Sequence, residues 1–336
     1  MVGKVSFNGI KGRMRAIFIT RSDISWYSKN ANVYQKPYQL SCKYDLTLCV
    51  SQKCCIPDEI SSKVSHIVRF KNIFDFLSPN RATRIIEKTI NASALIFTGF
   101  DFPCMWVGWR LKRKMGSKWT VFCWDPPSLS YRDRFPLLRW MIDFVFRWFL
   151  RRCDRLVLNI HPGLLDEIGY KPRVGQLECR MQDAFDGLVP APIADSDSFE
   201  YDFGVLSNWT VVKGAGLMAE VMRRMPDKTC LWIGDPPPSK NQTTEQSSIS
   251  FAGRLGQEEA FEKLRKCRVL VAPYLNVPSL KWNYVLKLFE YLKLGRPILA
   301  SDNPGNAAVA QKYPGRIILF QSGLAEDFVR KARTVL

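Results

Sequence analysis

Lys287 and Glu290 are the pair of residues whose types and spacing most directly suggest chemistry in this sequence. They lie three positions apart in segment 284–301, YVLKLFEYLKLGRPILAS, so a helix would carry both on one face. Gly295 is suited to end that helix, and a short buried strand would start at Pro297. A helix that begins beside the carboxyl end of a parallel strand can bind phosphate, and a carboxylate there can bind two ribose hydroxyls. A solvated ion pair on a helix surface would give the same spacing.

Two other segments predict groups that could bind the same anion. Segment 203–214, FGVLSNWTVVKG, predicts a strand, a polar loop and then Lys213 at the start of a helix. This arrangement presents backbone amides and an ammonium group to an anion, although an ordinary surface lysine would also fit there. Segment 251–274, FAGRLGQEEAFEKLRKCRVLVAPY, predicts a strand that ends in Gly-Arg-Leu, an amphipathic helix and a second strand. Together with the helix in 284–301, these segments would surround one cleft.

The elements that position these residues alternate between strand and helix. The apolar runs predict strands near 15–20, 45–50, 94–98, 120–123, 155–160, 203–206, 229–233, 269–273 and 297–300. The helical patterns between them lie near 81–90, 103–114, 135–152, 214–225, 257–266, 284–294 and 324–335. This order predicts an α/β protein with parallel sheets covered on both faces. A chain of 336 residues suits two such domains, and the Pro- and acid-rich segment 183–202 is typical of a linker between them.

In this order, the motifs resemble the C-terminal donor domain of nucleotide-sugar glycosyltransferases with the two-Rossmann (GT-B) fold, in the large retaining group 1 (family 4-like). Members of that group carry strand-loop-Lys-Gly, then a Gly-x-Leu loop with a Glu-Glu helix, then Lys-x-x-Glu-Tyr-x-x-x-Gly-x-Pro. The resemblance covers about 200–320 and extends more loosely to 118–127 (KWTVFCWDPP) and 149–160 (FLRRCDRLVLNI). It implies an N-terminal acceptor domain (1–190), a nucleotide-sugar donor domain (191–322) with its sheet across a cleft from the first, and a last segment (323–336) whose helix crosses back to the N-terminal domain.

The resemblance also implies roles for residues of the donor domain. The carboxylate that matches Glu290 binds the ribose, and the lysine that matches Lys213 binds the diphosphate and stabilises it as a leaving group. That charge stabilisation is what transfer from a nucleoside diphosphate sugar most needs, and Lys213 with the helix amides near Tyr284 would supply it without a metal. The predicted nucleotide-sugar site comprises Glu290, Lys287, Tyr284, Ser207, Asn208, Gly253, Arg254 and Leu255. The predicted co-substrate is a UDP- or GDP-linked sugar, with no other cofactor.

In addition to Lys213 in the donor half, the sequence offers two catalytic candidates in the N-terminal half. Asp125 follows an apolar strand and precedes two prolines, where a turn-forming aspartate is an equally good interpretation. Trp124 stands where the family often has a histidine that touches the donor sugar or the acceptor. His161, before Pro-Gly at another strand end, is interpreted first as an ordinary loop histidine.

Several positions depart from the family pattern. Trp282 stands eight positions before Glu290, where members commonly have a second glutamate, and Val205 follows Gly204, where an arginine is usual. The glycine-rich loop after the first strand is replaced by RSDISWYSKNANVY at 21–34. These departures leave open a catalytically inactive GT-B-like protein that acts as a membrane-associated partner of an active transferase.

The charge of the chain points to an anionic partner. Lys and Arg number 49 against 31 Asp and Glu, a formal net charge of +18. Segment 132–155 alternates seven arginines with large apolar residues at helical spacing, which is typical of a basic amphipathic helix at an anionic membrane surface. A core helix with arginines on its solvent face fits equally well. The residues predicted to contact the membrane are Arg139, Trp140, Arg147, Trp148, Arg151 and Arg152.

Other classes of protein fit the sequence less well. The ten cysteines are scattered in a way typical of a reducing cytoplasm, and with two histidines the sequence predicts no metal site. No run of about 18 apolar residues predicts a membrane span, and no recognised nucleic-acid motif is present. The resemblance to GT-B enzymes therefore implies a metal-independent, hexosyltransferase-type glycosyltransferase of polysaccharide or glycoconjugate synthesis. It would be cytoplasmic and peripheral on the inner face of the membrane, act on a saccharide or lipid-linked saccharide acceptor, and bind no nucleic acid.

Overall fold

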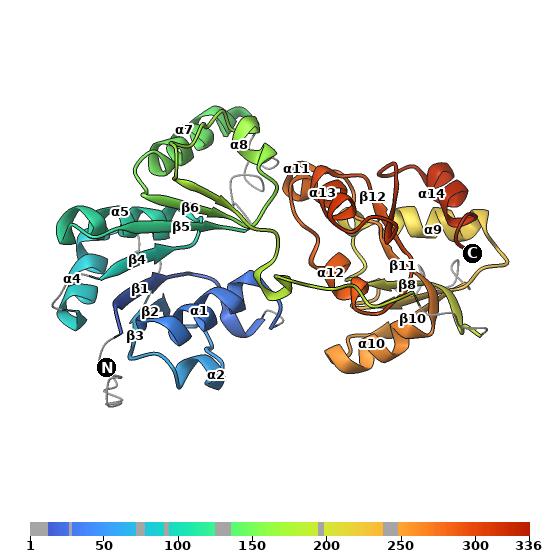
Figure 1. Cartoon of the computed structure of the whole chain (residues 1–336), viewed down its shortest axis with the longest axis horizontal. Coiled ribbons are helices and arrows are strands. Elements are labelled where there is room, and N and C mark those ends of the chain that lie inside the picture. Colours follow the sequence, from blue (N-terminus) through green and yellow to red (C-terminus); the bar gives the residue numbers. More distant parts are fainter. Residues whose placement is uncertain are drawn as a thin grey trace. The chain divides into compact units, whose positions relative to one another are not determined.

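The chain forms two α/β units, each built on a parallel sheet (Figure 1). The structure, a computed structural model, describes residues 13–26, 29–71, 78–90, 94–124, 136–193, 198–237 and 248–336. Unit 1 comprises Met1–Asp186 and unit 2 comprises Gly187–Leu336, so the division falls four residues before the boundary at 190 that the sequence predicts. The predicted fold class, two Rossmann-like domains with parallel sheets, is confirmed.

Unit 1 contains a seven-stranded sheet in the order β3-β2-β1-β4-β5-β6-β7. Its strands are β1 (Arg15–Ile19), β2 (Asp45–Ser51), β3 (His66–Phe70), β4 (Leu95–Thr98), β5 (Trp119–Cys123), β6 (Arg155–Leu158) and β7 (Leu177–Cys179), and each pairs in parallel with its neighbours. Its α-helices are α1 (Asn32–Lys43), α2 (Asp58–Ser61), α4 (Pro79–Thr89), α5 (Phe102–Met115), α7 (Arg139–Leu150) and α8 (Gly163–Glu167). Short 3-10 turns are η1 (Ile24–Trp26), η2 (Pro136–Leu138) and η3 (Asp183–Phe185).

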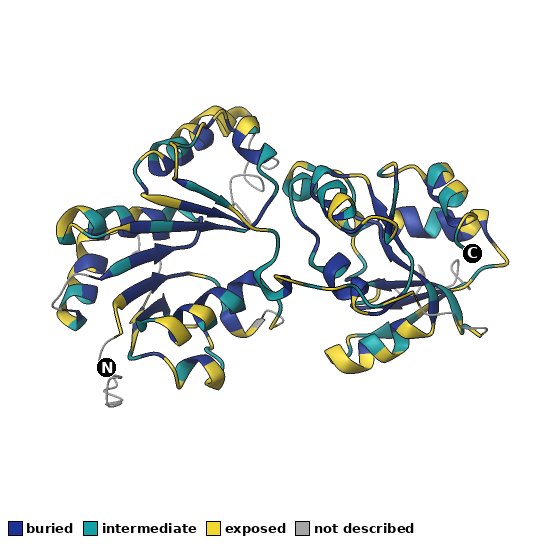
Figure 2. Ribbon diagram, in the orientation of Figure 1, coloured by how far each residue is buried: buried dark blue, intermediate teal, exposed yellow. Residues whose placement is uncertain are grey.

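The strands of unit 1 are apolar because helices cover both faces of their sheet. Helices α4, α5 and α7 pack next to one another, and α1 packs with α2 and β2. In the core the rings of Phe97 and Phe122 stack with centroids 5.7 Å apart, and Phe18 meets Phe122 edge-on at 6.2 Å. Figure 2 shows the central strands as buried and the outer helix faces as exposed.

Unit 2 contains a six-stranded parallel sheet in the order β10-β9-β8-β11-β12-β13. Its strands are β8 (Tyr201–Leu206), β9 (Cys230–Ile233), β10 (Ile249–Gly253), β11 (Cys267–Ala272), β12 (Ile298–Ser301) and β13 (Ile317–Phe320). Its helices are α9 (Ala215–Arg224), α10 (Gln257–Arg265), α11 (Pro278–Lys281), α12 (Leu286–Leu292), α13 (Pro304–Lys312) and α14 (Ala325–Ala332), with the 3-10 turn η4 (Val211–Lys213).

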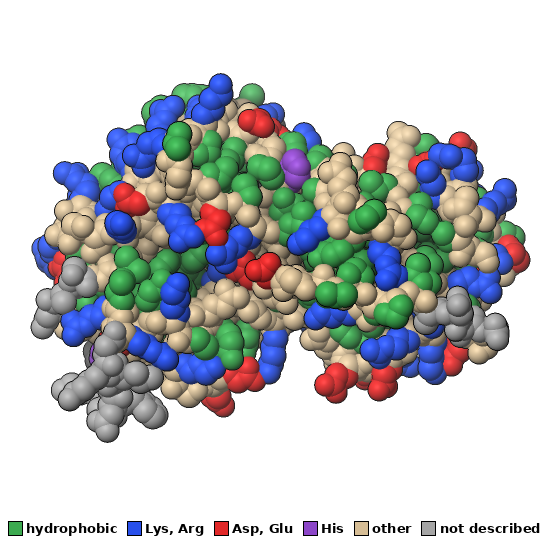
Figure 3. Space-filling model, in the orientation of Figure 1, with side chains coloured by type: hydrophobic (Ala, Val, Ile, Leu, Met, Phe, Trp, Pro, Cys, Tyr) green, Lys and Arg blue, Asp and Glu red, His purple; other side chains and the backbone are tan. Residues whose placement is uncertain are grey.

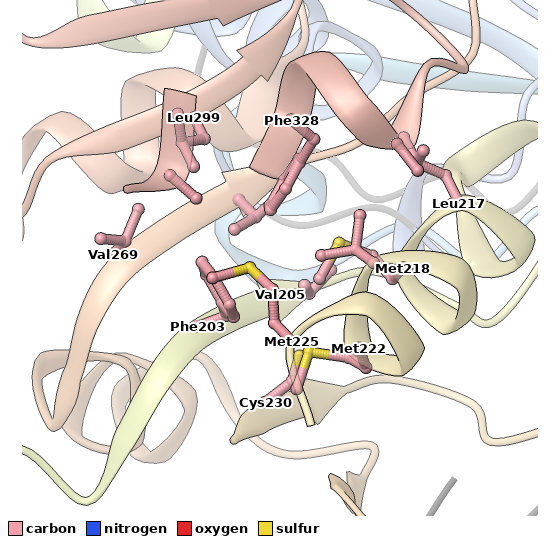
Figure 4. Packing of buried hydrophobic residues seen from close by; sticks show 14 of the residues in the cluster. Phe203, Val205, Leu217, Met218, Met222, Met225, Cys230, Val269, Leu299 and Phe328 are labelled. Carbon is pink, nitrogen blue, oxygen red and sulfur yellow. The ribbon is translucent and has the colours of Figure 1, made fainter. Parts of the chain in front are cut away.

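The C-terminal helix belongs to the core of unit 2 (Figure 4). Phe328 of α14 lies edge-on to Phe203 of β8 at 5.5 Å and to Phe320 of β13 at 5.0 Å. Helix α14 also packs along α9, so its apolar face is buried within the unit from which it emerges. Burial of Phe328 holds the helix in unit 2, and the expectation that 323–336 crosses back to the N-terminal domain stays a prediction.

The structure also contains elements that the apolar pattern did not indicate. Strand β3 lies at the sheet edge and exposes three of its five residues, so its sequence lacks a continuous apolar run. The helical pattern at 135–152 becomes the turn η2 followed by α7. In the part of the chain that the structure describes, no helix combines the length and apolarity needed to cross a bilayer.

Candidate functional site

The candidate site lies where the strand order of unit 2 reverses, between β8 and β11. Strands β9 and β10 continue to one side of this point, and β12 and β13 to the other. In open parallel sheets, ligands bind outside the carboxyl ends of the strands at such a reversal. The loop after β8 carries Ser207 and Asn208 and leads through η4 into α9, as the sequence predicts.

Gly214 allows the start of α9 to lie directly against the end of β11. Its φ is +85°, and a Cβ atom on it would lie 2.0 Å from the carbonyl oxygen of Pro273. Only glycine fits both constraints without a shift of the backbone. Lys213 is therefore held beside the point of strand reversal by the residue that follows it.

Lys213 is a partly buried cation next to a second cation. Burial lowers the pKa of its ammonium group, the nearby charge of Lys287 lowers that pKa further, and Asp235 opposes both effects. Within 198–237 and 248–336, no side chain accepts a hydrogen bond or forms an ion pair with Lys213 Nζ. Lys213 therefore carries a positive charge at the sheet edge that an anion would stabilise, whereas the charge of Lys287 is paired with Glu290.

Glu290 is buried, whereas a carboxylate that binds a ribose would be expected to be exposed to the site. The residue is 1% exposed, and Lys287 Nζ donates to its Oε2 at 2.7 Å. The predicted placement of both side chains on one face of α12 agrees with this contact. For the carboxylate to reach a ribose, the pair with Lys287 would first have to open.

Arg254 is held by a carboxylate that the sequence analysis did not select. Its guanidinium donates through Nε and through one terminal nitrogen, at 2.6 Å, to the two oxygens of Asp235. This fork keeps the pKa of Asp235 below its usual range. Asp235 follows β9 and precedes three prolines, and that position at a strand end is the signal that could have identified it.

Other predicted donor-site residues contribute mainly to the shape of the site. The hydroxyls of Ser207 and Tyr274 lie 3.4 Å apart in the interior, where burial raises the pKa of Tyr274 to about 12. Asn208 accepts a long bond from the Asp235 amide, and Gly253 accepts from the Gly234 amide at 2.9 Å. Tyr284 is buried and Leu255 half-buried. The structure thus groups the predicted residues at one edge, with Lys213, Lys287 and Arg254 as its cations.

The sheet of unit 1 reverses in the same way between β1 and β4. There Arg21 lies 3.9 Å from Asp101, which also accepts from the Cys104 amide and so caps α5. Burial raises the pKa of Asp101, and its bonds with Cys104 and the charge of Arg21 oppose that rise. The Trp124 indole lies beside Gly99, at the same place. Asp125 lies outside the described residues.

His161 lies in the loop after β6, as expected for an ordinary loop histidine. Its Nδ1 accepts a bond from the Gly163 amide at 3.1 Å, at the start of α8. Burial lowers the pKa of the ring. These contacts fit a loop histidine that orders the turn after β6.

A buried ion pair near the end of unit 1 has no counterpart in the sequence analysis. Lys36 of α1 pairs with Asp183 of η3, and each side chain is 2% exposed. Asn159 donates to the same carboxylate at 3.0 Å, and the Lys36 ammonium lies 4.6 Å from the Phe122 ring centroid. The pair fixes η3, which immediately precedes the boundary between the units, to α1.

The residues predicted to contact a membrane lie on or just after α7. Trp140 is 71% exposed and Arg151 is exposed, while Arg139 lies 3.9 Å from Asp143 and 3.8 Å from Glu167. Helix α7 has a buried apolar face, as a core helix would, and an exposed apolar face as well, and its contact with a membrane stays a prediction. The other two predicted arginines donate hydrogen bonds to backbone carbonyls of unit 1, Arg147 to that of Ile168 and Arg152 to that of Trp148.

In the described part of the chain, no three His, Cys, Asp or Glu side chains come together as metal ligands would.

Comparison with known proteins gives the fold its name. Residues 201–336, most of unit 2, match the family "Glycosyl transferases group 1". Three solved structures with the same fold are Anabaena Alr3699/HepE in complex with UDP (TM-score 0.71, 12% identity), the lipopolysaccharide outer core galactosyltransferase WaaB (0.66, 13%) and a glycosyltransferase from Rickettsia africae (0.61, 11%). Each covers 96% of this chain, and the chain covers 89%, 90% and 88% of them. No curated protein is similar enough to match.

The chain therefore has the GT-B fold, and the predicted resemblance is confirmed in that respect. At 11–13% identity the solved structures show the fold alone, while the family match of unit 2 supports glycosyltransferase function. The comparisons give no support to the alternative of an inactive partner protein.

Proposed function

We propose that this GT-B protein is a glycosyltransferase that binds a nucleotide sugar at the β8–β11 edge of unit 2. It would transfer the sugar to a saccharide or lipid-linked saccharide held by unit 1. The observation that carries this proposal is the placement of Lys213. Gly214 holds it at the point of strand reversal, and the charge of Lys287 is close enough to lower the pKa of its ammonium group.

The proposal of a nucleotide-sugar donor follows from the positive charge at the β8–β11 edge, which requires an anionic ligand. A nucleoside diphosphate carries negative charge on its phosphate oxygens, and that charge grows on the leaving group as the bond to the sugar breaks. Lys213 and Lys287 would stabilise it without the help of a divalent metal. The Anabaena structure is a complex with UDP, and a second structure of that protein contains UDP and glucose, which supports UDP as the first donor nucleotide to test and GDP as the second.

The proposed reaction exchanges one bond for another at the anomeric carbon. The bond from C1 to the diphosphate oxygen breaks, and its electron pair leaves with the diphosphate, where the lysines lie. An acceptor hydroxyl oxygen forms the new bond to C1 and loses its proton to solvent or to a base. We propose hexosyl transfer in polysaccharide or glycoconjugate synthesis, in line with the galactosyltransferase name of WaaB.

Nucleotide binding tests the proposal most directly. UDP or GDP should raise the melting temperature of the wild-type protein, because a ligand that binds only the folded state stabilises it. Lys213→Ala should weaken binding roughly tenfold to hundredfold, the usual range for one lost charged hydrogen bond. Lys312→Ala, an exposed lysine at the end of α13, is the matched control. No stabilisation by UDP, GDP or ADP, or equal effects of both variants, would show that the donor site is wrongly assigned.

We also propose that the protein is cytoplasmic and attaches peripherally to an anionic membrane surface, such as the inner face, through unit 1. Arginines and exposed aromatic residues of α7 support this attachment, since both are typical of helices at membrane interfaces. Figure 3 shows Lys and Arg side chains over this part of unit 1, with hydrophobic side chains between them. Co-sedimentation with acidic vesicles should fall with salt, whereas salt-insensitive or absent binding would contradict the attachment.

A further inference from the structure

Helix α7 carries two apolar faces, and only one of them is used by the fold. Ile142, Phe146 and Phe149 are buried against the rest of unit 1. Met141 and Phe144, at helical spacing on the other face, are 43% and 53% exposed. A second apolar face on a surface helix is not needed for packing, so it indicates a binding surface.

The exposed face of α7 forms one wall of an apolar groove of about 570 Å³, whose other wall is α5. This volume lies within the range of sites for small molecules, roughly 300–1,000 Å³. Three indoles lie along it or next to it: Trp106 and Trp148 have ring centroids 6.2 Å apart, and Trp109 and Trp148 4.9 Å apart. The apolar groove is lined by Phe102, Pro103, Trp106, Met141, Phe144 and Trp148, among others.

Nearer its carboxyl end, the same helix α5 lines a basic hollow together with α4. This hollow, of about 420 Å³, is lined by Asn80, Thr83, Arg84, Arg110, Arg113 and Lys114. Among the residues that the structure describes, one carboxylate pairs with a cation of this hollow, Glu87 with Lys114. The hollow is therefore suited to an anion that carries more than one charged oxygen.

The apolar groove and the basic hollow are joined by a packed pair of indoles. The Arg113 guanidinium, which lines the hollow, lies 5.3 Å from the Trp109 ring, and that ring packs on Trp148 of the groove. On the far side of the pair, the Arg152 guanidinium lies 3.6 Å from the Trp148 ring. Trp106 and Arg113 are seven residues apart on α5, which is roughly 10 Å along a helix. One amphiphilic molecule can span such a distance with its charged end and its chain.

We propose that the groove and the hollow together form a binding site for a single anionic lipid. The groove takes one hydrocarbon chain, and the hollow takes the phosphate. The choice of a lipid rests on this pairing of groove and hollow. The choice of an anionic one rests on charge, because the segments 79–89, 102–115 and 139–155 that build the site contain twelve Lys and Arg but two Asp and one Glu. The inference rests on the proposed membrane attachment of unit 1 and sharpens it. The protein would be held at the membrane by one lipid hydrocarbon chain that enters a preformed site, as well as by charge.

A short-chain lipid tests the site in the absence of any bilayer. Dihexanoylphosphatidylglycerol, kept monomeric, is titrated into the full chain by calorimetry and should saturate at one equivalent. Dihexanoylphosphatidylcholine has the same chains without the net charge, and glycerol phosphate has the charge without the chains. Both should bind roughly tenfold more weakly, since each lacks one half of the recognised molecule. Equal binding of the two lipids, equal binding of glycerol phosphate, or no saturable binding would overturn the proposal.

Matched variants separate the two halves of the site. Phe144→Ser should weaken binding of the short-chain lipid roughly fivefold. About half of the Phe144 side chain is exposed in the free protein, and the variant loses the apolar contact that this half would make with the lipid chain. Arg113→Gln should weaken the phosphate half by a similar factor. Val174→Ser, in an exposed loop of unit 1, and Arg223→Gln, on the exposed face of α9, are the controls and should leave lipid binding unchanged. Equal losses in variants and controls would contradict the site.

Three further readouts separate the lipid site from the proposed function, from peripheral attachment by charge alone and from a dimer. The increase in melting temperature with UDP or GDP should be the same in Phe144→Ser as in the wild type. If the wild type binds the short-chain lipid but no nucleotide, the proposed function is overturned and the lipid site is not. Salt-sensitive binding to phosphatidylglycerol vesicles without short-chain binding would leave the peripheral attachment standing and overturn the lipid site. A wild-type dimer that Phe144→Ser dissociates in ultracentrifugation would show that a second copy covers the groove, which also overturns it.

Discussion

The carboxyl edges of the two sheets are equivalent places in two similar units, yet they differ at one cation. Among the described residues of unit 2, Lys287 and Arg254 are paired with carboxylates, but Lys213 is not. In unit 1 the cations near the edge lie beside carboxylates: Lys36 is paired with Asp183, and Arg21 lies 3.9 Å from Asp101. In unit 2, Lys213 makes no ion pair with any residue that the structure describes there, and the charge of a second lysine, Lys287, lowers its pKa.

This difference separates charges that hold the fold from charges that await a ligand. A buried cation without a partner destabilises a protein unless something compensates it, so paired charges are the ordinary solution in an interior. Lys213 departs from that solution at the point of strand reversal, where ligands of parallel sheets bind. The contrast therefore predicts large stability effects in unit 1 and large binding effects in unit 2.

Removal of the Lys36 charge should produce the largest effect on stability. Lys36→Met leaves Asp183 buried without its cation, which should lower the free energy of unfolding of unit 1 by about 3–5 kcal/mol. Urea unfolding, followed by a probe in unit 1, measures the loss. The double variant Lys36→Met/Asp183→Leu should recover most of it, because no unpaired charge remains. A single variant as stable as the wild type would contradict the structural role of the pair.

A methyl group at Gly214 should produce the next largest effect, and in unit 2. Gly214→Ala places a Cβ atom 2.0 Å from Pro273 O on a backbone with φ of +85°, so we expect a loss of roughly 2–4 kcal/mol in the free energy of unfolding. Gly216→Ala, two residues later in α9, meets nothing within 4 Å and should stabilise slightly. Similar results for the two variants would show that the close approach does not determine the start of α9.

The fold and part of the site could be predicted from the sequence because they depend on local patterns. Alternating strands and helices predicted both parallel sheets, and the segment around Lys213 predicted a strand, a loop and a helix that the structure confirms. The Lys287 and Glu290 contact followed from their spacing on one helix. Each of these inferences needs only neighbours in the chain.

Pairing between distant elements could not be predicted in this way. Lys36 and Asp183 are 147 residues apart, and no periodicity in either segment indicates the other. Arg254 was predicted as part of the nucleotide-sugar site, and the sequence did not show that its charge is engaged by Asp235, 19 residues earlier, through the register of β9 and β10. The burial of Glu290 and the second apolar face of α7 also depend on which helices pack beside them, and sequence spacing alone leaves that open.

The lowered pKa of Lys213 predicts how nucleotide binding changes with pH. Binding needs the ammonium form, so affinity should fall as pH rises through a pKa that burial and Lys287 place below the ordinary 10.5. Without ligand the sign is opposite: between the lowered pKa and 10.5 the unfolded chain binds more protons, so stability rises with pH. In Lys213→Arg the charge persists, and UDP or GDP affinity measured by calorimetry should stay level at alkaline pH. The same alkaline loss in both proteins would contradict the role of Lys213.

Loss of the Asp235 charge should produce the smallest effect and the most specific one. Asp235 raises the pKa of Lys213, so Asp235→Asn should move the alkaline decline of nucleotide affinity to lower pH. The Asp235–Arg254 pair is exposed and should contribute little to the stability of the fold, so the melting temperature without ligand should stay close to that of the wild type. Asp202→Asn, at the start of β8, removes a carboxylate on the opposite edge of the same sheet and serves as the control. If both variants shift the decline equally, the effect arises from net charge, and Asp235 has no particular influence on Lys213.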